Sequence, residues 1–182
     1  WWAGAGKLWG SISDGYALFD ETFEGDAGPV SRSIASGPVD NINWMLSMQR
    51  LLVGTEGAEF SVKASSLDEP LTPTNFGIRP TSTQGSKAVR AICADQNGYF
   101  VNRSGMKLYE LTPGGQLNDY TALDLTAIVP EVGYPSIVRI DIQRQPDTRV
   151  HCVLSDGTCA VLVLDHSEEV ACLLYTSPSP RD

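Results

Sequence analysis

Four short turns that end in glycine divide this chain, and each lies between runs rich in apolar and β-branched residues. The clearest is segment 51–62, LLVGTEGAEFSV, in which an apolar run leads to the turn at Gly57 and apolar residues then alternate with polar ones. Glycine adopts a positive φ at little cost, and an alternation of period two buries one face of a strand. The segment therefore predicts a β-hairpin. The other turn glycines are Gly15, Gly105 and Gly157.

Each of these turns has a predicted strand on either side. The predicted pairs are 8–12 with 16–19, 51–55 with 58–62, 99–101 with 106–109, and 150–154 with 159–164. A further apolar run precedes three of the hairpins, at 42–48, 88–93 and 137–142. Each unit therefore predicts three consecutive strands.

The connections between units are rich in Ser, Thr, Pro and Gly and leave room for outer strands. We expect an edge strand near 31–35 and an outer strand at 75–79. In a later connection, residues 124–129 could form a short helix that ends at Pro130.

The spacing of the units favours a β-propeller. Successive turn glycines lie 42, 48 and 52 residues apart. A period of this size with three or four short strands is typical of a propeller blade, since solenoid repeats of similar length are helical. We therefore expect an all-β chain that forms an incomplete β-propeller of three to four small antiparallel blades. Because the period drifts, a Greek-key β-sandwich is the alternative.

Composition and charge argue against a nucleic-acid-binding protein and against a membrane-spanning protein. The 182 residues are 42% hydrophobic and 19% charged, as in ordinary globular proteins, and the net charge is -9. An acidic chain lacks the basic surface with which proteins grip nucleic-acid phosphates. No run reaches the roughly 18 to 20 apolar residues of a membrane span, so we expect none.

Both ends of the sequence suggest a fragment. The chain begins at Trp1 without an initiator Met and enters its first hairpin almost at once, so we expect the native start to lie upstream. The last eleven residues, CLLYTSPSPRD, resemble the translation of a transposase adapter used to prepare sequencing libraries. We therefore expect residues 1–171 to be a propeller fragment and residues 172–182 to be a non-native tail that packs on nothing.

No motif assigns a catalytic, cofactor-binding or metal-binding residue. Cys93, Cys152 and Cys159 lack metal-ligand spacing and are expected to be buried, reduced thiols in strands, although the last two could face each other across a hairpin. The histidines, His151 and His166, lack a third ligand at suitable spacing. No Gly-x-Ser-x-Gly elbow is present to anchor a catalytic triad. We expect neither enzymatic activity nor a cofactor.

Several other patterns have ordinary structural explanations. The acidic residues at 20, 21, 24 and 26 lack the cadence of a calcium loop and predict a solvated acidic loop. The segment Gly4–Lys7 lacks the spacing and the Ser or Thr of a phosphate loop. The segment Pro70–Pro73 could be a polyproline ligand, but an extended loop is commoner. The sequon Asn102–Ser104 lies within a predicted turn.

Several stretches carry a resemblance to a known family. They are GSISDGY at 10–16, SGPVD at 36–40, INW at 42–44, DEPLTP at 68–73, QGS at 84–86 and QRQPDTRV at 143–150. On these stretches the chain resembles the tail nozzle, or tail tubular protein B, group of structural proteins from short-tailed bacteriophages.

The resemblance implies a non-enzymatic virion protein with propeller modules. Such proteins form a ring, commonly a hexamer, at the end of the tail tube and contact other tail proteins, while DNA passes through without specific binding. The implied location is the virion tail, assembled in the bacterial host cytoplasm. The alternatives are a propeller that binds proteins in a cell and, less favoured, a propeller or sandwich hydrolase.

Overall fold

A computed structural model describes residues 1–34, 41–66, 69–114, 119–165 and 170–176, with side chains described as far as Leu164. These residues form β-strands and one short 3-10 helix, η1 (Pro130–Gly133), and contain no α-helix. The prediction of an all-β chain built from small antiparallel sheets is confirmed. The chain divides into two compact units, Trp1–Gly85 and Ser86–Asp182.

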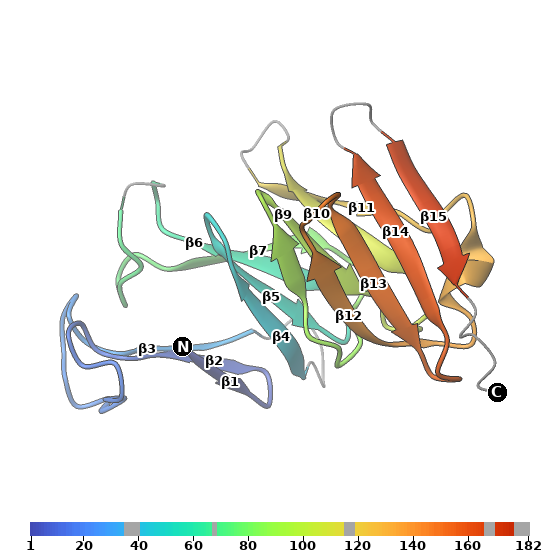
Figure 1. Ribbon diagram of the computed structural model, residues 1–182. Helices are drawn as coiled ribbons and strands as arrows, with labels where there is room; N and C mark the ends of the chain where they lie inside the picture. Colours follow the sequence, from blue (N-terminus) through green and yellow to red (C-terminus); the bar gives the residue numbers. More distant parts are fainter. Residues whose placement is uncertain (35–40, 67–68, 115–118, 166–169, 177–182) are drawn as a thin grey trace. The chain divides into compact units, whose positions relative to one another are not determined.

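Unit 1 contains two sheets (Figure 1). The first has the order β1-β2-β3, and its strands are β1 (Trp2–Gly4), β2 (Lys7–Gly10) and β3 (Val30–Ser33). The second has the order β4-β5-β6-β7, and its strands are β4 (Ile42–Ser47), β5 (Leu51–Thr55), β6 (Glu59–Lys63) and β7 (Gly77–Ser82). The hairpin predicted around Gly57 is thus the pair β5–β6, and the predicted strands near 31–35 and 75–79 are β3 and β7.

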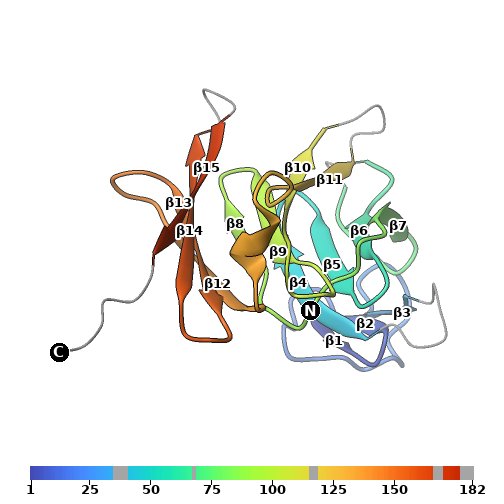
Figure 2. The ribbon, with the colours of Figure 1, turned by 90° about the vertical axis from the view of Figure 1, so that its right-hand side faces the viewer.

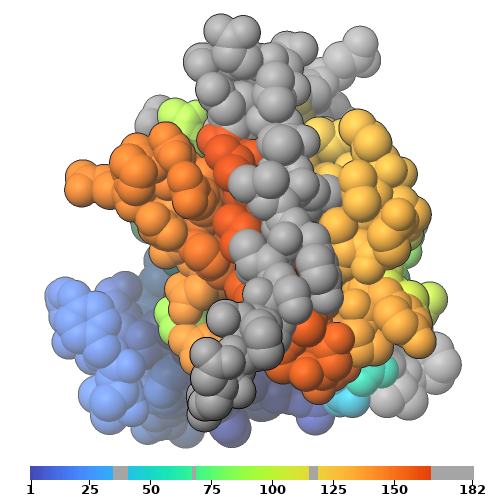
Figure 3. Space-filling view, turned by 45° about the vertical axis from the view of Figure 1, so that its right-hand side comes forward, coloured from blue at the N-terminus to red at the C-terminus, as the bar shows by residue number. Residues whose placement is uncertain are grey.

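Unit 2 contains two four-stranded sheets. The first has the order β11-β10-β9-β8, and its strands are β8 (Ile92–Ala94), β9 (Asn97–Val101), β10 (Leu108–Pro113) and β11 (Tyr120–Asp124). The second has the order β12-β13-β14-β15, and its strands are β12 (Ile137–Gln143), β13 (Arg149–Leu154), β14 (Cys159–Asp165) and β15 (Val170–Thr176). The connection between the two sheets, gold in Figure 3, forms part of the surface of this unit.

Every described sheet is a meander in chain order, as in a propeller blade, and none has the Greek-key crossing of the sandwich alternative. Within each unit the backbones of the two sheets approach at their first strands, β1 with β4 and β8 with β12. Figure 2 shows the second of these approaches. Blades arranged radially also come closest at their first, inner strands.

The first sheets of the two units are equivalent. In β1–β2, Trp2 pairs with Trp9 and Gly4 with Lys7 around a tight turn; in β8–β9, Ile92 pairs with Tyr99 and Ala94 with Asn97 around a turn of the same length. The first residue of each turn, Ala5 or Asp95, has a positive φ.

The second sheets of the units are equivalent as well. The hairpins β4–β5 and β12–β13 share an irregularity after their first residue pair, between Ile42 and Trp44 in one and between Ile137 and Arg139 in the other. A bulge increases local twist and fixes register. The chain therefore repeats at two levels. The small antiparallel sheet recurs four times in the described residues, and the pair of sheets that makes up unit 1 recurs in unit 2.

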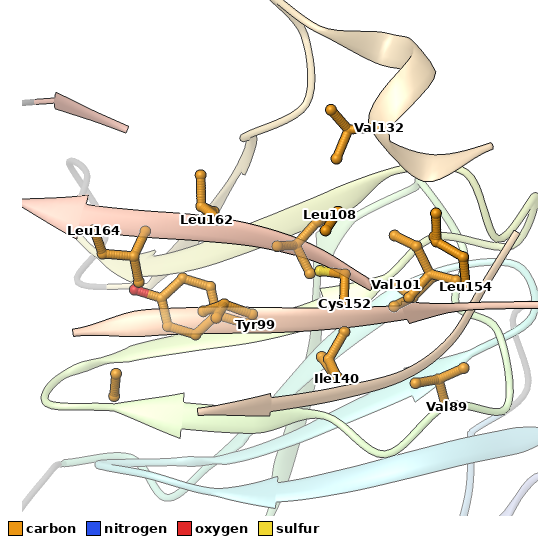
Figure 4. Close-up of a cluster of buried hydrophobic side chains, with 14 residues drawn as sticks. Val89, Tyr99, Val101, Leu108, Val132, Ile140, Cys152, Leu154, Leu162 and Leu164 are labelled. Atoms are coloured by element: carbon orange, nitrogen blue, oxygen red, sulfur yellow. The ribbon is translucent and has the colours of Figure 1, made fainter. Parts of the chain in front are cut away.

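Each unit has its own apolar core. In unit 1 the core joins β2 with β5 and β6; its buried members are Leu8, Ile34, Leu51, Val53, Ala58, Phe60 and Val62. In unit 2 the core joins the two sheets and is closed by Val132 of η1; Figure 4 shows side chains of both sheets pointing toward one another. Burying each Leu, Ile or Phe side chain contributes about 1.5–3 kcal/mol, so the facing sheets stabilise each other.

Three strand and helix predictions were wrong. The first hairpin uses the turn at Ala5 and Gly6, and residues 16–19 form no strand because their apolar side chains are exposed in a loop. Residues 88–91 precede a strand that begins only at Ile92. No helix forms at 124–129, because Asp124 ends β11 and the 3-10 helix starts at Pro130.

The expectation that the tail packs on nothing was wrong for residues 172–176. Residues 172–176 belong to β15, which pairs along its whole length with β14, from Cys159 opposite Thr176 to Asp165 opposite Val170. The physical reason is that this segment is apolar and β-prone, and its backbone satisfies the otherwise open edge of β14. Residues 177–182 lie outside the described residues.

Gly54 provides a test of the packing in unit 1. A Cβ at this position would collide with the indole of Trp44, which is 5% exposed. We expect Gly54→Ala to lower the free energy of unfolding by about 1–3 kcal/mol because the indole must move. Urea denaturation would measure this.

The matched control is Gly77→Ala in the same sheet, where the nearest atom to the new Cβ is the Lys63 carbonyl oxygen at 3.4 Å. A change within about 0.5 kcal/mol is expected there. Equal effects of the two substitutions would contradict the role given to Trp44.

Removal of residues 172–182 should destabilise unit 2, since it exposes the edge of β14. We expect the melting temperature to fall by about 5 °C or more. Removal of 177–182 alone, which keeps β15, should leave it unchanged. Identical melting curves for the full chain and the longer deletion would show that β15 contributes nothing.

Candidate functional site

A cavity of about 230 Å³ lies in unit 1. The turn between β4 and β5, the end of β6 and the connection that follows supply its walls. Its lining residues are Trp1, residues 47–51, residues 62–66, Glu69 and Leu71. The cavity is smaller than the roughly 300–1,000 Å³ of most small-molecule sites, so its size fits one small polar group.

A hydrogen-bonded network fixes the polar wall of this cavity. The Ser65 hydroxyl and the Asn75 side-chain amide both donate to Oε2 of Glu69, each at 2.6 Å. The Ser65 backbone N–H donates to Oδ1 of Asn75 at 2.8 Å. The hydrogen bonds from Ser65 and Asn75 hold the pKa of Glu69 below its ordinary value. Glu69 is therefore an ionised acceptor at neutral pH and a poor general acid.

The lining of this cavity also includes an aromatic side chain. Trp1 lines the cavity and stacks on Phe76, with the ring centroids 6.0 Å apart. An indole that lines the same cavity as a carboxylate and several hydroxyls is suited to binding, because aromatic rings supply area and the polar groups supply orientation. No sequence pattern pointed to this cavity, since its walls come from segments far apart in the chain.

Two glutamates are buried in the described sheets, Glu59 at 1% exposure and Glu110 at 5%. Oε1 of Glu110 accepts hydrogen bonds from the Tyr99 hydroxyl at 2.7 Å and from the Asn97 amide at 2.9 Å. Burial and the hydrogen bond to Glu110 raise the pKa of Tyr99 far above its ordinary value. This network is enclosed in the core of its sheet, where it fixes the pairing of β9 with β10.

The histidines and cysteines are not brought together in a described site. His151 Nε2 lies 3.0 Å from Oε1 of Gln143, while His166 lies outside the described residues. Cys152 pairs with Ala160, so it does not face Cys159 across the hairpin, and all three described cysteines are free. Cys93 is exposed rather than buried, and burial raises the pKa of Cys152 to about 12.

The acidic residues at 20–26 lie exposed in the connection between β2 and β3. The Asp20 carboxylate accepts hydrogen bonds from Thr22, Glu21 lies 3.6 Å from the Lys7 ammonium, and Asp26 accepts from the Thr74 hydroxyl. Over the described part of the chain, no three His, Cys, Asp or Glu side chains are grouped to hold a metal ion.

Two other sequence patterns lie in turns. Gly4–Lys7 contains the turn of the first hairpin. In the sequon, Oδ1 of Asn102 accepts from the Ser104 hydroxyl at 2.9 Å and from the Lys107 backbone N–H at 3.2 Å, so the amide is part of its turn.

The stretches that resemble the nozzle group lie mostly at strand ends. Residues 10–16 join β2 to the following loop, Glu69–Pro73 lies beside the cavity, and residues 143–150 join β12 to β13. Residues 36–40 and Asp68 lie outside the described residues.

No protein-family model and no curated protein sequence matches this chain. Among the residues that the structure describes, no helix has the length and apolar character needed to cross a membrane.

The Tyr99–Glu110 contact gives a testable prediction. Tyr99→Phe removes a donor from a buried carboxylate, and we expect the free energy of unfolding to fall by about 1–3 kcal/mol. Tyr134→Phe is the control, because Tyr134 is 67% exposed. If urea denaturation found the two variants equally stable, the buried hydrogen bond would have no structural weight.

Proposed function

We propose that this chain is a non-enzymatic structural component of a bacteriophage tail, of the nozzle type, which assembles as a ring with other tail proteins around a conduit for DNA. The proposal combines the resemblance of the stretches quoted above with the repeat of small sheets. In this proposal the four described sheets are successive blades of an incomplete propeller.

The meander sheets are the observation that carries the proposal. A four-stranded sheet of this size cannot bury both of its faces alone, and radial packing against neighbours covers them without long open edges. The approach of the first strands within each unit supports blades rather than a sandwich. In such an assembly, sheets that pack against one another would form a rigid scaffold, and this is the role that we propose for the chain.

The charge of the chain supports a conduit. A net charge of -9 repels the phosphates of DNA, so DNA that passes through the conduit would not bind to this chain. The alternative function, a propeller that binds proteins in a cell, is favoured by the exposed aromatic residues of the connection between β2 and β3.

The position of the coding sequence among its neighbours tests the proposal directly. Adjacent portal, capsid and tail genes are expected, and a metabolic operon would contradict the tail role. Antibodies raised against the chain should label the tips of phage tails in electron micrographs, with anti-capsid antibodies labelling only heads as the control. The chain should also fail to retard double-stranded DNA at about 0.15 M salt.

A further inference from the structure

The connection between β2 and β3, residues 11–29, is an addition to the repeated unit. In unit 2 the equivalent strands β9 and β10 are joined by residues 102–107 alone. The two connections begin alike: the Gly15 N–H donates to the Ile12 carbonyl at 3.2 Å, as the Gly105 N–H donates to the Asn102 carbonyl at 2.9 Å. Because residues 102–107 are enough to join the equivalent strands of unit 2, the connection of residues 11–29 is longer than this strand pair needs. We call residues 11–29 the β2–β3 loop.

The β2–β3 loop has a defined backbone. The Ile12 N–H donates to the Leu18 carbonyl and the Ser13 N–H to the Ala27 carbonyl, each at 3.0 Å. These bonds close the loop on itself, and Figure 1 shows it extending beyond the ends of the strands it joins. Its side chains are thus presented on a pre-organised frame, which lowers the entropic cost of binding.

The loop exposes four large apolar side chains within a short span. Tyr16 is 89% exposed, Leu18 54%, Phe19 37% and Phe23 59%. Scattered exposed apolar residues are ordinary, but a group on one ordered loop marks an interaction surface. Aromatic side chains are also the residues that most often carry binding energy at protein interfaces.

The charge of the loop selects the partner. Asp14, Asp20, Glu21, Glu24 and Asp26 accompany the apolar residues, and the sequence from position 8 to 31 contains no Lys or Arg. A two-fold contact between two copies through this loop would bring like charges together, and anionic lipid or nucleic acid would be repelled. We propose that the β2–β3 loop docks onto a protein surface that has an apolar groove bordered by Lys and Arg. This inference does not depend on the tail assignment.

A designed peptide can stand in for such a surface. The probe is a helical Leu/Lys peptide with one apolar face and one basic face, titrated into the full ¹⁵N-labelled chain. We expect saturable chemical-shift changes confined to the β2–β3 loop and weaker binding as salt increases. A Lys/Ser peptide, which has no apolar face, and a Leu/Glu peptide, which has no basic face, should bind at least about tenfold more weakly.

Two variants locate the binding. Replacing residues 11–29 with residues 102–107 of unit 2 should keep the sheet and weaken binding at least about tenfold. The double substitution Tyr16→Ser and Phe23→Ser keeps the loop backbone and should have the same effect even if the replacement fails to fold. Ile128→Ser is the control, because Ile128 is 90% exposed and lies outside the loop; its affinity should be unchanged.

Several results would overturn the proposal. Undiminished binding by the double variant would place the site elsewhere, and equal binding of the Lys/Ser peptide would reduce the effect to charge alone. Binding of the loop to phosphatidylcholine vesicles, with no response to the Leu/Lys peptide, would identify a lipid surface. Self-association that the double variant abolishes, again with no response to the peptide, would identify a second copy as the occupant.

Discussion

The packing of one small sheet against the next is the interaction on which each unit depends. A four-stranded sheet with strands of three to seven residues has too little apolar area to be stable alone. In unit 2 the side chains of β9 and β10 meet those of β12, β13 and β14 in one cluster, and β15 covers the last backbone edge. The packing between sheets therefore depends on the register of the hairpins, because a shift by one residue would turn each apolar face away from the neighbouring sheet.

Comparison of the two units distinguishes the shared scaffold from features that lie in the connections. The tight first hairpin and the bulge of the second recur in both units although their residues differ, so backbone register is what the two units share. The cavity beside Glu69 and the β2–β3 loop lie in connections, where the scaffold tolerates change. Binding and assembly can therefore be altered there without disturbing the shared cores.

Local signals explain how much could be predicted from sequence. The β5–β6 hairpin was predictable because its turn and its alternation lie within one short segment. The first hairpin was missed because its turn starts at Ala5, a residue type that rarely has positive φ. Tyr16, Leu18 and Phe19 suggested a strand, since an apolar pattern cannot reveal whether a partner face will meet it. The cavity and the burial of Glu110 depend on distant segments, which no local pattern specifies.

The meander order also has a kinetic consequence. Within each sheet every strand after the first pairs with the one that precedes it along the chain, so no sheet needs a partner strand from another part of the chain while it forms. Pairing between strands that are neighbours in sequence costs less loop-closure entropy and favours rapid folding compared with sheets that need distant partners. During synthesis, a sheet can therefore zip up strand by strand as its segments leave the ribosome, and the next sheet finds an apolar face already in place.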